Sequence, residues 1–129
     1  FDMSDNSGGG IGECGVCFRQ TGTSEVVTYG CQWYNNATSK FGGTKWDSST
    51  AVNSTYVNTQ YPGSPFAWFW VQIIDDNTNR VFKMSPDGQH WITIHSVTRT
   101  DHLTADQVGI YVNPYSCETA MSLISWKEA

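Results

Sequence analysis

The sequence lacks several features that identify common classes of protein. It contains no run of about 18 apolar residues, which a membrane-spanning helix requires, so no membrane insertion is expected. Seven Lys and Arg stand against twelve Asp and Glu and form no basic cluster of the kind that holds a phosphate backbone. Nucleic acid is therefore not an expected partner. The chain has no basic and apolar leader and starts at Phe1, which suggests a processed product or a domain excised from a longer protein.

Motifs for nucleophilic and metal catalysis are missing as well. No Gly-x-Ser-x-Gly elbow occurs, and none of the three histidines has a partner at the HExxH spacing. Cys14 and Cys17 have the CxxC spacing, but a zinc ribbon needs a second such pair and a thioredoxin-type motif needs a helix after it. Neither follows here, so the expected state of the four cysteines is buried thiols or one disulfide.

Strand-forming and turn-forming residues are abundant. Phe, Trp and Tyr make up 14% of the chain, only 15% of residues are charged, and Thr, Ser, Asn and Gly are frequent. β-branched and aromatic residues favour strands, whereas Gly and Asn favour the turns between them. The 129 residues fit one domain, and no segment longer than about eight residues has a helical period. The chain is therefore predicted to be a single all-β domain over residues 1–129.

The N-terminal segment predicts a β-hairpin. Residues 11–20 and 25–34 alternate between apolar and polar positions, and a two-residue loop at Gly22 and Thr23 would pair them antiparallel. Arg19, Thr28 and Gln32 then share the polar face. The opposite face collects Cys14, Val16, Phe18, Val27, Tyr29 and Cys31. This pairing places Cys14 opposite Cys31, so a bridge between them is geometrically allowed.

Further strands are predicted at 66–74, 80–85, 91–95, 108–113 and 119–126, whereas residues 35–65 are expected to form long loops with short strands around Trp46 and Tyr56. Pairing of the first two strands gives these partners: Trp70 and Ser85, Val71 and Met84, Gln72 and Lys83, Ile73 and Phe82. At least seven strands joined largely by turns predict an antiparallel β-sandwich.

The segment from Trp68 to Val112 resembles a known family. Its aromatic strand is followed by Asp75-Asp76-Asn77-Thr78-Asn79-Arg80, the turn Ser85-Pro86-Asp87-Gly88 with Trp91, Arg99, Leu103-Thr104, and Val108-Gly109-Ile110-Tyr111. This order is similar to that of the concanavalin A-like (laminin G-type) jelly-roll domains of phage tail and fibre proteins and of bacterial surface carbohydrate-binding modules. The resemblance covers about the C-terminal half of the chain. It implies a jelly-roll sandwich, glycan binding by a concave sheet and its rim, sometimes with calcium, and an extracellular or virion location.

Glycoside hydrolases of this fold carry paired acids on alternate residues of one strand, which aims both carboxylates at one sugar linkage. No such run occurs in this sequence, where Glu13 and Glu25 are isolated and Asp75 and Asp76 fall in a predicted turn. The expected function is therefore non-catalytic glycan recognition. A small glycan-cleaving enzyme remains an alternative, because two acids from separate strands could meet.

A sugar site needs a flat aromatic platform beside planar polar groups, because sugar rings present apolar C–H faces surrounded by hydroxyls. The best predicted platform is Trp68, Trp70 and Gln72 on one face of their strand, with Lys83 opposite Gln72. The predicted rim residues are Trp33, Asn35 and Trp46. A structural alternative uses the same aromatic face to contact neighbouring proteins, copies of this chain or the rest of a parent protein.

No cofactor is required by this reading, and calcium is the one metal for which candidate ligands exist. Two oxygen-rich segments could hold it: residues 2–7, and the turn that contains Asp75, Asp76, Asn77 and Asn79. Acidic residues in turns more often accept hydrogen bonds from their own backbone, which is the alternative for both segments.

Overall fold

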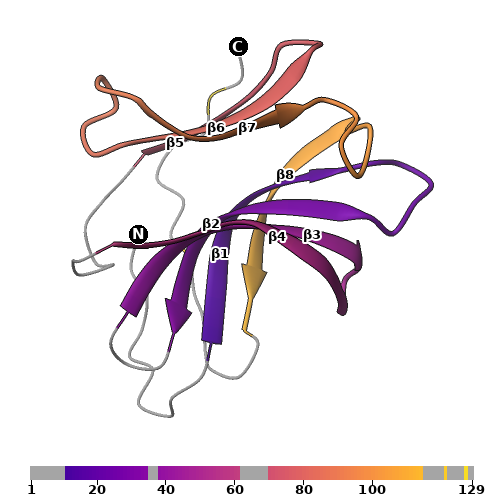
Figure 1. Cartoon of the computed structure of the whole chain (residues 1–129), viewed down its shortest axis with the longest axis horizontal. Helices are drawn as coiled ribbons and strands as arrows, with labels where there is room; N and C mark the ends of the chain where they lie inside the picture. Colours follow the sequence, from indigo (N-terminus) through magenta and orange to yellow (C-terminus); the bar gives the residue numbers. More distant parts are fainter. Residues whose placement is uncertain (1–10, 35–37, 62–69, 115–120, 122–126, 128–129) are drawn as a thin grey trace.

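The computed structural model describes residues 11–34, 38–61, 70–114, 121 and 127. In this part of the chain eight strands form two antiparallel sheets that face each other (Figure 1). The strands are β1 Ile11–Arg19, β2 Val26–Tyr34, β3 Thr38–Ser48, β4 Ala51–Tyr61, β5 Trp70–Asp75, β6 Asn79–Ser85, β7 Ile92–Thr98 and β8 Gln107–Asn113. The all-β sandwich predicted from the sequence is confirmed. The described residues form no helix that could cross a membrane.

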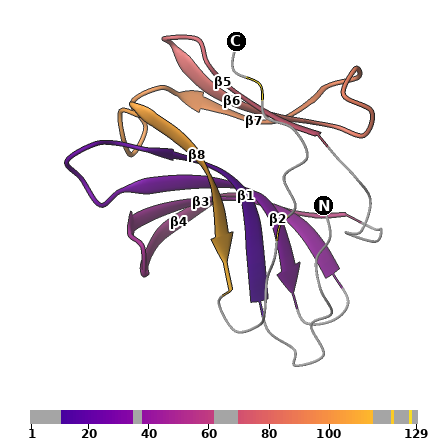
Figure 2. The ribbon, with the colours of Figure 1, turned by 180° about the vertical axis from the view of Figure 1, so that it is seen from behind.

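The chain builds one sheet after the other and then returns to the first. The five-stranded sheet has the order β4-β3-β2-β1-β8, and the three-stranded sheet has the order β5-β6-β7. Figure 2 shows β8 beside β1, although six strands separate them along the chain. Each sheet is mostly a meander of sequence neighbours, and the jelly-roll connectivity implied by the resemblance remains a prediction.

The first predicted hairpin is present with the predicted register. Phe18 pairs with Val27, Val16 with Tyr29, and Cys14 with Cys31. The loop is longer than predicted, because ladder pairing ends at Arg19 and Val26 and leaves six residues between the strands. Cys14 and Cys31 are free thiols, so the bridge that the register allows is not formed.

The prediction of long loops is wrong for residues 38–61, although the strands expected around Trp46 and Tyr56 are present and longer than predicted. Strands β3 and β4 each have 11 residues and pair with each other, with register shifts between Gly43 and Thr44 and again between Lys45 and Ser48. The sequence of these strands is rich in Ser, Thr, Asn and Gly, which sequence rules assign to loops. Pairing on β2 and the cost of leaving backbone groups without partners outweigh that weak local preference.

The second predicted hairpin is confirmed residue by residue. In β5 and β6, Val71 pairs with Met84, Gln72 with Lys83, and Ile73 with Phe82, and Trp70 faces Ser85. The predicted strands at 91–95 and 108–113 appear as β7 and β8 with slightly longer bounds. Residues 66–69 of the first predicted strand, and nearly all of the strand predicted at 119–126, lie outside the described residues.

The core lies between the sheets, and both predicted apolar faces contribute to it. Its buried members are Val16, Phe18, Val27, Tyr29, Phe82, Met84, Leu103 and Ala105. Tyr29 connects the layers: its ring stacks on Phe82 of β6 with 5.0 Å between centroids, and on Tyr56 of β4 at 6.1 Å. Val71 and Ile73 of β5 pack against the same cluster. Burial of each such side chain contributes about 2 kcal/mol.

Strands β1 and β2 approach each other closely at a pair of glycines. Gly15 and Gly30 are direct partners in the ladder. A Cβ added at Gly30 would lie 2.1 Å from the carbonyl oxygen of Cys14, and one at Gly15 would lie 2.2 Å from that of Tyr29. Both contacts are with backbone, so neither can be relieved by a side-chain rotation.

We therefore expect Gly30→Ala to lower the free energy of unfolding by about 3 kcal/mol, because the central ladder must shift to admit one methyl group. Gly109→Ala on β8 is the matched control, since a Cβ there meets only the Cys17 Sγ at 3.6 Å, an ordinary contact. Urea denaturation of both variants measures the difference. Equal stability of the two variants would contradict the close approach.

Candidate functional site

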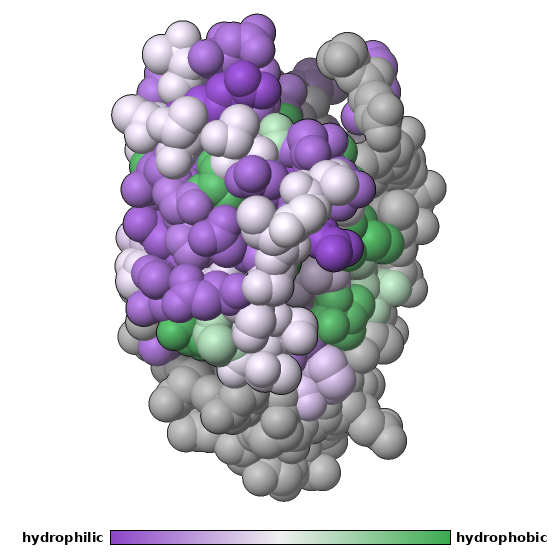
Figure 3. Space-filling model, turned by 90° about the vertical axis from the view of Figure 1, so that its right-hand side faces the viewer, coloured by the Kyte–Doolittle hydropathy of each residue, from purple (hydrophilic) through white to green (hydrophobic). Residues whose placement is uncertain are grey.

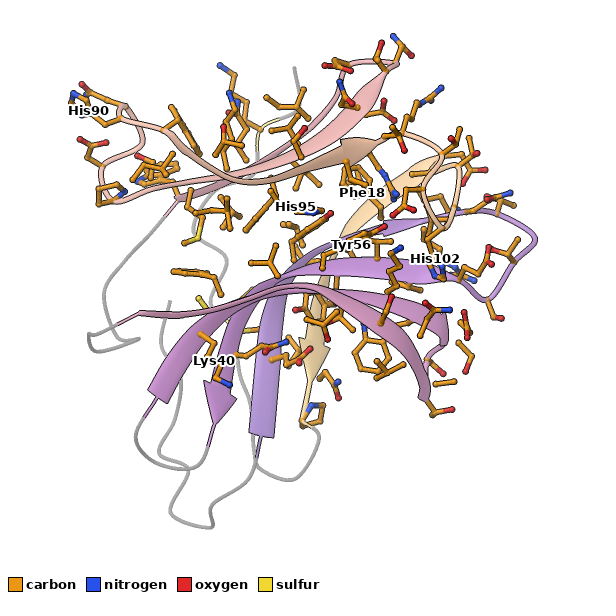
Figure 4. The ribbon with its side chains drawn as sticks, in the orientation of Figure 1. Phe18, Lys40, Tyr56, His90, His95 and His102 are labelled. Carbon is orange, nitrogen blue, oxygen red and sulfur yellow. The ribbon has the colours of Figure 1, made fainter. Side chains whose placement is uncertain are left out.

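The outer face of the three-stranded sheet presents the predicted platform to solvent. Because residues alternate along a strand, Val71 and Ile73 face the core while Trp70 and Gln72 face outward. Trp70 is 49% exposed. We call this surface the outer face, and its described residues are Trp70, Gln72, Ile74, Val81, Lys83, Thr93 and Ser96. It points away from the five-stranded sheet (Figure 4).

The Trp70 indole rests on the turn that follows β6. A Cβ added at Gly88 would lie 3.1 Å from Cε2 of Trp70 and 3.2 Å from both Cδ2 and Nε1. Nearly equal distances to three bonded ring atoms mean that the face of the indole, not its edge, covers the glycine. Gly88 also has a φ of 75°, which a side chain would strain. The turn therefore needs glycine here both for its backbone and for the seat of Trp70.

Asp87 holds this turn in one conformation. Its Oδ1 accepts hydrogen bonds from the backbone amides of Gln89 and His90, both at 2.8 Å, and from the Ser85 hydroxyl at 2.9 Å. Its Oδ2 lies 2.6 Å from Nδ1 of His90, and the Ser85 Oγ accepts the amide of Gly88 at 2.8 Å. These bonds, led by those from His90, hold the pKa of Asp87 well below its usual range. The seat of Trp70 is thus preorganised.

Next to Trp70, the middle of the outer face carries hydrogen-bonding groups of three kinds. Gln72, Lys83 and Thr93 are ladder neighbours on β5, β6 and β7, so an amide, an ammonium and a hydroxyl lie in one row across the sheet. No ion pair of Lys83 is found among the described residues. Its donors are therefore available to a ligand.

The predicted rim residues do not join this face. Trp46 lies on the far side of the five-stranded sheet, where its Nε1 donates to the Thr28 Oγ1 at 2.9 Å and its carbonyl oxygen lies 3.0 Å from Nε2 of His102. Trp33 belongs to β2 of the same sheet, opposite Gly12. The structure thus groups Trp70, Gln72 and Lys83 and separates them from Trp46 and Trp33. Trp68 and Asn35 lie outside the described residues.

The candidate calcium ligands are engaged in their own turn between β5 and β6. Asp75 accepts the amide of Asn77 at 3.0 Å through Oδ1 and pairs with Arg99 at 2.9 Å through Oδ2. Asp76 Oδ1 accepts two amides of the turn, that of Asn79 at 2.5 Å, and these bonds lower its pKa. Within the described ranges no group of three or more His, Cys, Asp or Glu side chains could hold a metal ion.

The CxxC pair is divided between the two faces of β1. Cys14 faces the sandwich core and is fully buried, whereas Cys17 lies on the other side, near Gly109 of β8. Residues three apart on a strand point in opposite directions, so these thiols cannot converge on one ion. Burial raises the pKa of Cys14 to about 12, which keeps it a protonated thiol.

The structure contains a charged cluster between the sheets that the sequence did not predict. Asp101 is its centre: the Tyr56 hydroxyl donates to Oδ2, the Lys45 Nζ lies 2.9 Å from the same oxygen, and the Arg80 Nη2 donates to the backbone carbonyl. Lys45 also lies 4.4 Å from the centre of the Tyr56 ring. The hydrogen bond from Tyr56, followed by those of Lys45, lowers the pKa of Asp101. These residues come from β4, β3, β6 and the segment after β7. Because they lie far apart in the sequence, no local sequence pattern could have predicted the cluster.

Arg80 is the most deeply buried charge of this cluster. It is 1% exposed and lies over the Phe18 ring, with 5.6 Å from Cζ to the ring centre. Its Nε and Nη1 have no hydrogen-bond partner among the described residues. An unpaired guanidinium donor in a core is costly, so the cation–π contact and the Asp101 carbonyl offset only part of the desolvation.

His95 lies in the same layer and is partly buried. Figure 4 shows it between the sheets with Tyr56, whereas Lys40 lies on the opposite face of the five-stranded sheet. Its Nδ1 is 3.0 Å from the Tyr29 hydroxyl. A register shift in β7 opposite Phe82 and Lys83 turns His95 toward the core. Burial lowers its pKa, so the neutral ring is favoured.

On the far side of the five-stranded sheet, Glu13 is a buried carboxyl with one unsatisfied oxygen. It is 8% exposed, its Oε1 accepts the Gln32 Nε2 at 2.6 Å, and its Oε2 has no partner in the described part of the chain. Burial raises the pKa of Glu13 from its ordinary value of 4.5 to about 7. Glu13 is therefore partly protonated at neutral pH.

This shift predicts a pH-dependent stability. Because the folded pKa exceeds the unfolded one, the contribution of Glu13 is fully present below pH 4.5 and is lost as pH rises through 7, by about 3 kcal/mol. Glu13→Gln cannot ionise, so we expect it to match the parent protein at pH 4 and to be more stable by about 3 kcal/mol at pH 8. Urea denaturation at both pH values tests this. A difference that is the same at pH 4 and pH 8 would show that Glu13 does not titrate as described.

Comparisons with protein-family models, curated proteins and solved structures give no match to this chain. Functional argument therefore starts from the residues and geometry of the outer face.

Proposed function

We propose that this domain is a non-catalytic glycan-binding module that recognises a cell-surface or other polysaccharide through the outer face of its three-stranded sheet. The observation that supports this most strongly is Trp70, whose indole is 49% exposed while one of its faces is fixed on Gly88. Large aromatic side chains are usually buried, so a half-exposed indole on a rigid seat is a suitable ligand platform.

The neighbours of Trp70 suit a sugar better than an apolar ligand. A pyranose ring can stack its C–H face on the indole, while Gln72, Lys83 and Thr93 can bond to hydroxyls at the ring edge. A planar amide and an ammonium group beside the indole can distinguish epimers, because moving one hydroxyl changes which donors are satisfied. Lys83 can also pair with the carboxylate of an acidic sugar.

The rigid seat of Trp70 supports binding of a ligand that makes few contacts and stays partly exposed to solvent. Binding is weakened when side chains must be ordered on association, by about 1 kcal/mol for each rotamer-rich side chain. The Asp87 bonds already order the turn beneath Trp70 before any ligand arrives. Less of the favourable stacking energy is then lost to the entropy cost of ordering the Trp70 platform on binding.

The carboxylates around the three-stranded sheet fit a binding role rather than hydrolysis. Asp75, Asp76 and Asp87 accept bonds within their own turns, and Asp101 is held by Tyr56 and Lys45. A hydrolase needs one acid held protonated near neutral pH, yet the pKa values of Asp76, Asp87 and Asp101 are all lowered. An extracellular or virion-surface location, and any use of calcium, belong to this proposal through the family resemblance.

The test is a glycan array of neutral and acidic structures, probed with and without calcium, followed by titration of the best ligand. We expect Trp70→Ala to weaken binding by about 2 kcal/mol, roughly thirtyfold in Kd, because the stacking surface is removed. Its thermal unfolding should change little, since Trp70 is half-exposed.

Val52→Ala is the matched control, because Val52 is also an exposed apolar residue, at 57%, but lies on β4 of the other sheet. It should bind like the parent protein. No binding on the array would rule out the glycan proposal and favour a protein-contact role for the outer face. Equal binding by Trp70→Ala would place the site elsewhere.

A further inference from the structure

Strand β8 ends the five-stranded sheet and leaves an apolar row exposed. Within the described residues it pairs with β1 alone, and its Val108, Ile110 and Val112 lie opposite Phe18, Val16 and Cys14. They therefore lie on the core side of the sheet, yet they are 45%, 47% and 43% exposed. Side chains on that side of the neighbouring strand β1 are buried, so the burial stops abruptly at β8.

The position of the three-stranded sheet explains why the core-side residues of β1 are buried and those of β8 are exposed. β5 contacts β1 and β7 contacts β4, so the smaller sheet covers β1 to β4 and ends before β8. In Figure 3 hydrophobic atoms reach the surface on the side of the molecule where Figure 2 shows β8. A contiguous exposed apolar row of this kind marks an interaction surface.

The other edge strands have features that prevent pairing with a strand of another molecule, and β8 lacks these features. Bulges shift the register of β4 and of β7, and β5 ends in a carboxylate at Asp75. Such bulges and charges prevent edge-to-edge pairing. β8 has an unshifted ladder with β1 and contains no proline and no charged residue from Gln107 to Asn113.

The sequence of β8 is complementary to itself in the antiparallel direction. A two-fold axis through Ile110 places it opposite its own copy and places Val108 opposite Val112. The same axis places Gln107 opposite Asn113, and Gly109 opposite Tyr111. Apolar residues thus meet apolar ones on the core side, and polar residues meet at the two ends of the pairing, as in stabilising cross-strand pairs.

We propose that β8 pairs antiparallel with β8 of a second copy of this chain, centred on Ile110, so that two five-stranded sheets join into one ten-stranded sheet. A self-complementary strand is what an isologous two-fold interface requires, because each residue must suit its own partner. The chain carries a net charge of −5, but the strand itself is neutral, so pairing at β8 brings no like charges into direct opposition.

Sedimentation and light scattering of the purified chain test this first. We expect a mass twice that of one chain, falling toward one chain on dilution. Ile110→Lys places two ammonium groups opposite each other at the axis and should make the protein monomeric. Val52→Lys, at the opposite edge of the same sheet, is the matched control and should leave the dimer intact. A monomeric parent protein at all concentrations, or a dimer that survives Ile110→Lys, overturns the proposal.

A charge-swap pair tests the register and guards against variants that simply fail to fold. Val108→Glu with Val112→Glu should be monomeric alone, as should Val108→Lys with Val112→Lys, because each then opposes like charges. Mixing them should restore a dimer with one copy of each, and failure to do so contradicts the register. Independently of any variant, hydrogen exchange of the β8 amides should slow as the concentration of the parent protein rises. Exchange that does not depend on concentration overturns the interface.

Discussion

The stack of Tyr29 on Phe82 is the contact on which the arrangement of the two sheets depends. Tyr29 is 1% exposed at the centre of the five-stranded sheet, and Phe82, also 1% exposed, is its counterpart in the middle of β6. Because Phe82 faces inward, alternation along β6 requires Lys83 to face outward. Gln72 is the ladder partner of Lys83, so Gln72 and Trp70 on β5 face outward as well. The exposure of the candidate site is thus a consequence of core packing.

Beside that stack the sandwich tolerates an unusual amount of polarity. Asp101 lies between the sheets next to the apolar core and contacts Arg80, Tyr56 and Lys45. Clusters of this kind rarely add net stability, because the cost of desolvating the charges matches the attraction between them. Their geometry nevertheless restricts how the segment after β7 can lie, since Asp101 must reach Tyr56 on β4 and Arg80 on β6 at once. The same segment then leads the chain into β8.

Local sequence patterns predicted those parts of the fold that depend on alternation. Both hairpin registers followed from apolar residues at every second position, and the outward direction of Trp70 followed from the register. The β3–β4 hairpin was missed because its Ser, Thr, Asn and Gly residues carry no alternating apolar signal, and its pairing is decided by β2. The inward position of His95 could not be predicted in this way, because a single bulge in β7 reverses the face that simple alternation would assign to it. Trp46 was grouped with the platform although it belongs to the other sheet, a distinction that only the tertiary arrangement makes.

The proposed pairing of β8, whose outer edge has no partner among the described residues, would have a consequence for the proposed glycan binding. A two-fold axis that joins antiparallel strands runs perpendicular to the sheet, so both three-stranded sheets of a pair stand on the same side of the joined sheet. The two Trp70 platforms then face one direction, toward a common surface. On a repetitive polysaccharide, the first contact raises the effective concentration of the second platform, and weak single sites combine into tight attachment. The dimer would then distinguish polysaccharides by the spacing of sugars along the polymer as well as by the identity of each sugar.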